Sequence, residues 1–212
     1  MTAFLSLYGK RILTAVGVHF MYVIVSVAIA FVIALIIGIL LSRVPRVANI
    51  MLPVLSVLQT IPGIVFIGVL FLYNGMVPST VICALAIYAI FPILKNTVVG
   101  LTAVPEQYKE AARGCGMSPL QILRKVELPL ATPVIISGVR MSTVYTVSWA
   151  VLAAMIGLGG LGELIYAGIS SNNSTLTLAG AIPAAILAVL MSLMIDIVSR
   201  RIVPRSLRRE AL

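Results

Sequence analysis

Four long stretches of this chain contain no Asp, Glu, Lys or Arg, and they constrain its fold more than any other feature. They lie at 12–42, 47–94, 141–162 and 164–195 and are 31, 48, 22 and 32 residues long. A helix of about 20 apolar residues, rising about 1.5 Å per residue, crosses the roughly 30 Å hydrocarbon core of a bilayer. Since 61% of the 212 residues are hydrophobic and 10% are charged, a water-soluble fold could not bury the apolar surface. The chain is therefore predicted to be an all-α polytopic protein whose solvent is the lipid bilayer.

The uncharged runs divide into five predicted membrane helices. The 48-residue run is too long for one helix and is interrupted at Asn74-Gly75 and Pro78, so it holds two. The predicted spans are Val18–Leu41, Ile50–Tyr73, Val77–Leu94, Met141–Ile156 and Leu176–Ile197. Residues 1–17 are expected to form a short amphipathic outer segment rather than a signal peptide, because the following apolar run is too long and lacks a small-residue cleavage site. The whole chain, 1–212, is expected to be one transmembrane domain.

The basic residues predict the orientation of this domain. A five-span topology puts thirteen of the fifteen Lys and Arg on one side, and only Lys10 and Arg11 on the other. Cytoplasmic loops of membrane proteins are enriched in Lys and Arg. We therefore expect the protein to lie in the plasma or inner membrane with its N-terminus outside the cell membrane and its basic tail, 198–212, in the cytoplasm. The net charge of +9 does not indicate nucleic-acid binding, because the basic residues lie at the ends of apolar runs and form no patch or stripe.

The longest polar stretch, 95–132, is predicted to be a rigid cytoplasmic loop. Pro105-Glu106 opens a short helix that Gly114 and Gly116 end. Ser118-Pro119-Leu120-Gln121 then has the pattern of a capping box, and the second helix is expected to stop at Pro129. Two short helices joined at a glycine corner can transmit force, whereas a disordered loop cannot.

One pattern in this loop resembles the EAA loop of ABC importer permeases of type I. Glu110-Ala111-Ala112 is followed after three residues by Gly116, and after nine more by Val126-Glu127-Leu128-Pro129, with Val126 where the family pattern has Ile. The resemblance implies a coupling helix seated in a groove of a cytoplasmic ATPase, and an ordinary helical hairpin is the alternative. The residues that it assigns to ATPase coupling are Glu110, Ala111, Ala112, Gly114, Gly116, Val126, Leu128 and Pro129. Small side chains would let the ATPase approach closely, and Glu110 would either hold the fold of the loop or pair with a basic group of the ATPase.

The resemblance also implies the partners. These are two cytoplasmic ATPase subunits, a second permease chain of the same or another kind, and an extracytoplasmic substrate-binding protein. The chain has no GxxxxGK[ST] motif, so ATP and Mg are expected on the ATPase, with no cofactor on this chain and no enzymatic activity of its own. Cys83 and Cys115 lie in different environments and are expected to form neither a disulfide nor a metal site.

The cargo follows from a finer resemblance. Gln59-Thr60-Ile61-Pro62, Lys95-Asn96-Thr97 and the run from Val126 to Arg140 look most like glycine betaine/carnitine/choline permeases. Methionine and other amino-acid permeases share the loop and are the nearest alternative. A channel or a polytopic membrane enzyme is the alternative from another class, although the spans contain no cluster of reactive side chains.

Polar and aromatic residues within the spans are the candidates for the transport path. Gln59 and Thr60, followed by Pro62, are costly in lipid unless they face a wet path or the bundle interior. Tyr145 and Trp149 share a helix face, and aromatic faces attract quaternary ammonium ions. Helix packing is the alternative for both sets.

The glycine-rich segment after the fourth span fits the pattern GxGxxG without its context. A dinucleotide site needs a preceding strand and a later acidic residue, whereas a membrane helix precedes this segment, so we interpret it as a bend on the outer side. The resemblance places the outer gate and the docking face of a binding protein here, at Gly157, Gly159, Gly160, Gly162 and Glu163. A solvated carboxylate at a helix start is the alternative for Glu163.

Overall fold

The computed structural model describes the backbone of residues 2–154 and 157–203, and the side chains within these ranges from residue 8. All its regular elements are helical, which confirms the all-α class for the described residues. The helices are α1 Thr2–Ser42, α2 Pro45–Leu58, α3 Gly63–Asn74, α4 Pro78–Thr102, α5 Glu106–Gly114, α6 Pro119–Ile122, a π-helical turn at Leu123–Glu127 (the π-turn), α7 Leu128–Ala154, α8 Leu161–Ser170 and α9 Ser174–Ile202.

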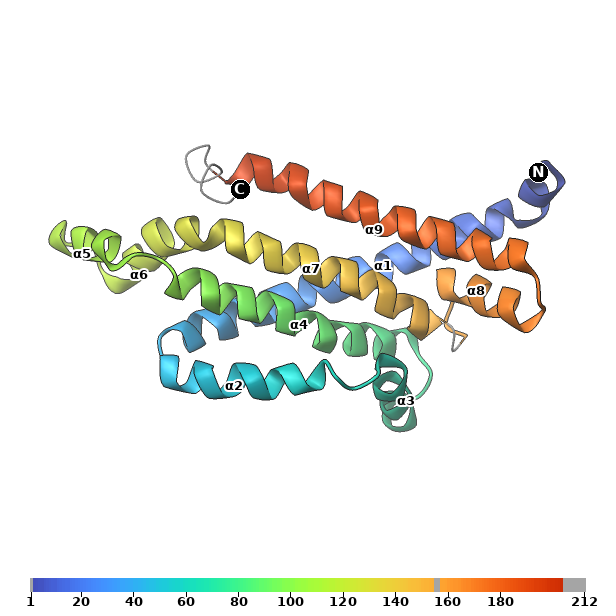
Figure 1. Ribbon diagram of the computed structural model, residues 1–212, viewed down its shortest axis with the longest axis horizontal. Helices are drawn as coiled ribbons and strands as arrows, with labels where there is room; N and C mark the ends of the chain where they lie inside the picture. The colour runs from blue at the N-terminus through green and yellow to red at the C-terminus, as the bar shows by residue number, and fades with distance from the viewer. Residues whose placement is uncertain (1, 155–156, 204–212) are drawn as a thin grey trace.

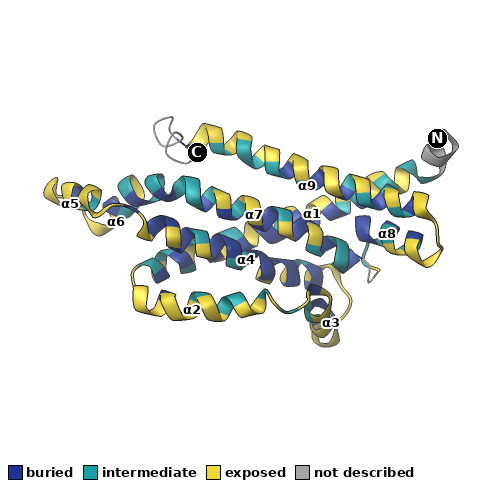
Figure 2. Ribbon diagram, viewed as in Figure 1, coloured by how far each residue is buried: buried dark blue, intermediate teal, exposed yellow. Residues whose placement is uncertain are grey.

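Three long helices, α1, α4 and α7, form the centre of the molecule (Figure 1). Figure 2 shows the buried residues gathered along these three, whereas α2, α3 and α9 present broad exposed faces. Small residues allow the close approach: Gly38 of α1 lies against Thr97 of α4, and Gly138 of α7 lies against Asn96. The exposed faces carry large apolar side chains such as Val54 and Ile197, as expected where lipid rather than water surrounds a helix.

The helices long and apolar enough to cross a bilayer agree with the predicted number of spans. Within the described residues these are Tyr8–Ser42, Pro78–Thr102, Pro119–Ala154 and Ser174–Ile202, and a fifth span results if α2 and α3 count as one broken span. Residues 2–17 form the start of α1 itself rather than a separate segment. The predicted ends at 155–156 and 204–212 lie outside the described residues.

The second predicted span, Ile50–Tyr73, is wrong as a single helix. α2 ends at Leu58, α3 starts at Gly63, and the two helices are inclined by 86°. Pro62 lacks a backbone N–H and disfavours a helical conformation at Ile61. The helix is therefore interrupted between α2 and α3. Residues 59–62 therefore form a corner between two helices and are not part of a continuous membrane helix.

The prediction that the second loop helix stops at Pro129 is also wrong. The helix continues from α6 through the π-turn into α7, with the Leu128 N–H donating to the Leu123 carbonyl five residues earlier. A proline inside an α-helix clashes with the carbonyl four residues back and leaves that carbonyl without a donor. The wider π-turn shifts the hydrogen-bond register immediately before Pro129, so the helix passes it without ending.

A further helix, α8, was not predicted. It packs against α9 in a hairpin, in which Gly168 approaches the backbone of Thr177 and Gly180 approaches Leu161. Asn173 caps α9 by accepting a hydrogen bond from the Leu176 N–H at 3.1 Å. The hairpin lies at the opposite end of the molecule from α5 and α6 (Figure 1).

Candidate functional site

The glycine corner of the 95–132 loop has the predicted geometry. Gly116 has φ +76°, which residues with a side chain rarely adopt, and its N–H donates to the Arg113 carbonyl at 2.9 Å. The predicted capping box is present: the Ser118 N–H donates to Gln121 Oε1 at 2.8 Å, and the Gln121 N–H donates to Ser118 Oγ at 3.4 Å. The turn between α5 and α6 is thus fixed by its backbone hydrogen bonds and by the cap, with Ala112 and Ile122 buried on either side of it.

The residues assigned to ATPase coupling differ in their exposure. Glu110, Ala111, Gly114 and Gly116 are exposed, Ala112 is buried, and Val126, Leu128 and Pro129 are half-buried. The exposed members form a surface of small side chains along α5 and its corner. Ala112 is buried within the loop, where α5 packs on the π-turn and α6, whereas Leu128 packs against buried residues of α4 and α7 such as Leu101 and Ala131.

Sequence reasoning missed two exposed side chains of this loop. Tyr108 and Leu120 are 49% and 55% exposed although they lie outside the apolar spans. The sequence offers no clear signal for them, because the same loop also contains apolar residues that are buried, such as Leu101, Val104 and Ile122. Together with the small residues, Tyr108 and Leu120 give the loop an apolar surface that projects from the bundle.

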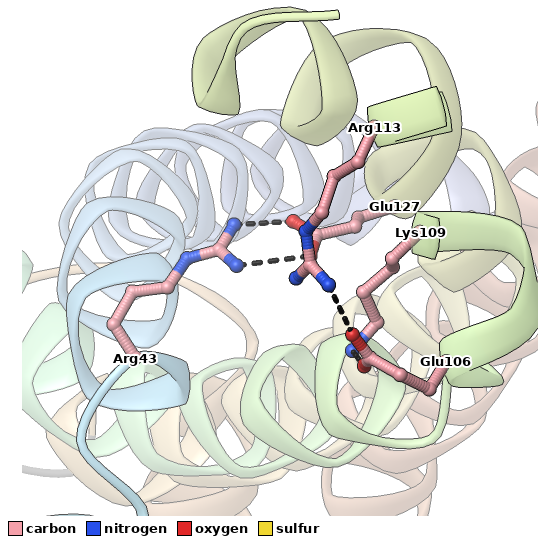
Figure 3. A network of polar contacts seen from close by, with 5 residues as sticks. All are labelled: Arg43, Glu106, Lys109, Arg113 and Glu127. Atoms are coloured by element: carbon pink, nitrogen blue, oxygen red, sulfur yellow. Dashed lines mark hydrogen bonds and ion pairs between the residues drawn. The ribbon is translucent and has the colours of Figure 1, made fainter. Parts of the chain in front are cut away.

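Charged side chains brace α5. Glu106 accepts from Lys109 at 2.9 Å and from Arg113 at 2.8 Å (Figure 3). The hydrogen bonds from these two cations hold the pKa of the Glu106 carboxyl below its usual value, and the bond from Lys109 has the larger effect. Glu110 makes no ion pair among the described residues.

A third ion pair joins the loop to the first helix. Arg43, directly after α1, directs both terminal nitrogens at the carboxylate of Glu127 in the π-turn, with Nη1 donating to Oε1 at 2.9 Å and Nη2 to Oε2 (Figure 3). The Glu127 side chain is 3% exposed and that of Arg43 is 47% exposed. The hydrogen bonds to Glu127 raise the pKa of Arg43. Sequence reasoning missed this pair because 84 residues separate its members.

The opposite end of the molecule contains the glycine bend. Gly157, Gly159 and Gly160 have φ between +81° and +94°, and a Cβ on Gly162 would lie 1.9 Å from the Val151 carbonyl oxygen. The bend therefore requires glycine, and it follows a helix, so the dinucleotide interpretation stays rejected. Glu163 lies in the first turn of α8 with its side chain 43% exposed, as the solvated helix-start alternative expects, and it also forms an ion pair with Arg11 of α1 at 2.9 Å.

The corner between α2 and α3 is fixed by side chains from α4 and α7. Gln59 Nε2 donates to the Tyr88 carbonyl at 3.1 Å, and the Tyr88 hydroxyl donates to the Ile61 carbonyl at 2.9 Å. The rings of Tyr88 and Trp149 stack with centroids 3.7 Å apart, and Trp149 lies directly against Gly63. Tyr88 was missed, because nothing in its apolar run marks it as a partner for the corner.

The candidate path residues separate into two groups. The corner brings Gln59 and Trp149 together through Tyr88 and Gly63. Thr60 and Pro62 are exposed, and Tyr145 is 48% exposed with no hydrogen-bond partner in the described part of the chain. Tyr145 lies one turn from Trp149 on α7 but does not join the stacked rings.

The two cysteines and the acidic residues give no sign of a metal centre. Cys83 and Cys115 are both free and exposed, one on α4 and the other in the loop. No group of three or more His, Cys, Asp or Glu side chains suited to a metal ion occurs among the described residues.

Comparison with known proteins gives matches that extend over most of the chain. Residues 30–208 match the family described as "Binding-protein-dependent transport system inner membrane component". The carnitine transport permease protein OpuCB of Listeria monocytogenes is 38% identical over 94% of this chain and 92% of its own length. The glycine betaine/carnitine/choline transport system permease protein OpuCB of Bacillus subtilis is 32% identical over 98% and 96% of the two chains.

Among solved structures, a chain of the MetNI methionine ABC transporter in an inward-facing conformation is similar with a TM-score of 0.82. The similarity covers 92% of this chain and 97% of that chain at 22% sequence identity. At this identity the comparison supports the fold, and it carries no information on what this chain transports.

Proposed function

The chain belongs to the family of binding-protein-dependent transport system inner membrane components and is the permease subunit of an ABC importer, and from this premise we propose that it forms half of the pathway for a small quaternary ammonium solute. The transporter uses a separate ATPase subunit and a substrate-binding partner, as the family does.

The observation that carries the cargo proposal is the similarity to relatives over almost the whole chain. Their names specify carnitine, choline and glycine betaine, all of which bear a trimethylammonium group. Aromatic faces attract such ions. The exposed ring of Tyr145 is the best-placed candidate on α7, because Trp149 is already stacked on Tyr88.

We further propose that the exposed part of the loop docks on the ATPase. Its contact surface would comprise Tyr108, Ala111, Gly116 and Leu120, which combine apolar area with a rigid glycine corner. Glu110 is exposed and makes no described ion pair, which supports pairing with a basic group of the ATPase over a role in the fold of the loop.

A second permease chain would complete the pathway. Polar groups facing lipid are costly, and Thr60, Tyr145 and Ser148 are exposed on the bundle. A wet pathway between two permease chains gives these side chains a suitable environment. The glycine bend at the opposite end would then face the binding protein on the outside, and α5 and α6 would face the cytoplasm.

Docking is tested by purifying the tagged chain from its native membrane in mild detergent and identifying its partners by mass spectrometry. We expect an ABC ATPase in the wild-type sample and its loss on Gly116→Trp, with the permease itself retained. Gly17→Trp is the matched control, because Gly17 lies on α1 outside the loop, is exposed and has open space around it. Absence of an ATPase under conditions that preserve other complexes would contradict the docking proposal.

Cargo is tested separately by uptake of labelled carnitine, choline, glycine betaine and methionine in cells that lack other carriers for them. Uptake of one of the first three is expected. Uptake of methionine alone would overturn the cargo proposal and leave the importer assignment intact.

A further inference from the structure

We propose that the Arg43–Glu127 ion pair transmits movement of the coupling loop to the first membrane helix. This inference rests on the proposed function, in which the loop docks on an ATPase. It assigns a positioning role to two residues outside the exposed docking surface (Figure 3).

The geometry makes this pair a directional connection. A guanidinium that donates two parallel hydrogen bonds to a carboxylate fixes both the distance and the relative orientation of the two groups. Arg43 follows the last residue of α1 and Glu127 ends the π-turn. Movement of the π-turn therefore displaces the end of α1.

Burial makes the connection hard to break. The Glu127 carboxylate is almost completely excluded from solvent, and a buried carboxylate that loses its partner is strongly unfavourable. Glu127 thus stays with Arg43 as the loop moves, because no other cation is described in contact with it. Arg113 lines the same pocket of about 470 Å³ beside the loop, yet its described ion pair is with Glu106.

The π-turn explains why a second connection is needed. α6 is covalently continuous with α7 only through this turn, whose five-residue spacing is rare and is a less regular joint than an α-helix. The hydrogen-bonded pair with Arg43 ties the last residue of this turn, Glu127, to the end of α1, so the joint cannot shift without displacing α1. Five residues before Arg43, Gly38 packs tightly against Thr97 of α4, so the displacement of α1 reaches α4 as well.

The experiment uses the complete importer, in lipid nanodiscs, with its ATPase and with binding protein loaded with carnitine or choline. The variants are Glu127→Gln, Arg43→Lys and the double variant with both changes. The readout is the ratio of ATP hydrolysis with loaded binding protein to hydrolysis without it, and the amount of co-purifying ATPase is measured in parallel. Arg46→Gln, an exposed basic residue of α2 without a described ion pair, is the control.

We expect each single variant to co-purify with the ATPase as the wild type does. The stimulation of ATP hydrolysis by loaded binding protein should be about tenfold lower than in the wild type, which lies within the 5–150-fold range of typical coupling between sites. Because the two side chains act as one unit, the double variant should lose no more than the larger single effect. Arg46→Gln should match the wild type.

Three results would overturn the inference. Single variants within about twofold of the wild type would show that the pair transmits nothing, and losses that multiply in the double variant would show that the residues act independently. Loss of the ATPase from Glu127→Gln would assign Glu127 to docking instead. Failure of the proposed function looks different, because no ATPase would then accompany even the wild-type chain.

Discussion

At the scale of single residues, the contact between Gly63 and Trp149 gives a direct test of the corner. A Cβ at Gly63 would lie 2.2 Å from Trp149 Cε3, and overpacking of this kind destabilises by about 1–3 kcal/mol. We therefore expect Gly63→Ala to lower the free energy of unfolding by that amount, measured by denaturation of the purified chain in detergent. Gly68→Ala is the control on the same helix, since nothing lies within 4 Å of its Cβ. Equal stability of the two variants would contradict the packing described.

Glu106 predicts a pH dependence confined to the loop. Lys109 and Arg113 depress the pKa of its carboxyl, so the ion pairs contribute stability above the unfolded pKa of about 4.3, and this contribution is lost as pH falls through the folded pKa. Glu106→Gln should therefore speed amide exchange in α5 at neutral pH, and its difference from the wild type should disappear in acid. The effect should also weaken in high salt, because the side chain is exposed. A constant difference between Glu106→Gln and the wild type at all pH values would exclude the ionic explanation.

At the scale of elements, the capping box at Ser118 and the turn at Gly116 could be predicted because each depends on residues a few positions apart. The break at Pro62 could not. Pro92, Pro133 and Pro183 all lie inside continuous helices, so a proline does not by itself decide where a helix ends. The corner is selected by contacts from Tyr88 and Trp149, which are distant in sequence.

The burial of Glu127 and the formation of α8 could not be predicted either, because both depend on contacts between residues that are distant in sequence. The motif around Glu127 is visible in the sequence, but its burial depends on Arg43 at the far end of another helix. α8 is 10 residues long and contains Gly162 and Gly168, so its local preference for a helix is weak. Its packing on α9 stabilises it, and the uncharged run gave no signal for that contact.

Two hydrogen bonds hold the corner to α4, and they give a prediction at this scale. Tyr88→Phe removes the hydroxyl that donates to the part-buried Ile61 carbonyl, and a hydrogen bond of this kind contributes about 0.5–1.5 kcal/mol to stability. We expect a loss in that range on denaturation in detergent, and a smaller combined loss with Gln59→Ala than the sum of the two, because both bonds hold the same segment. Tyr73→Phe, at an exposed tyrosine without a described partner, should have no effect. Strict additivity of the first two changes would mean that the bonds act separately.

At the scale of the whole molecule, α1 connects the two polar ends. Its 41 residues extend over about 60 Å at 1.5 Å per residue, about twice the thickness of a bilayer core. Arg11 near one end is paired with Glu163, and Arg43 beyond the other end is paired with Glu127. α1 therefore contacts both the glycine bend and the 95–132 loop, through an exposed and hence weak pair at Glu163 and through the buried carboxylate of Glu127.

This arrangement predicts which end of the molecule faces the cytoplasm. Cys115 in the loop is exposed, so in a Cys83→Ala background it should react with a membrane-impermeant maleimide in inside-out vesicles and be protected in intact spheroplasts. Ser170→Cys at the exposed end of α8, with Cys115 replaced by Ser, should give the opposite pattern. The physical reason is the distribution of Lys and Arg, thirteen of which lie on the side of the loop in the five-span topology. Labelling of Cys115 from the outside would reverse the orientation, and it would remove the α5–α6 surface from reach of any cytoplasmic ATPase.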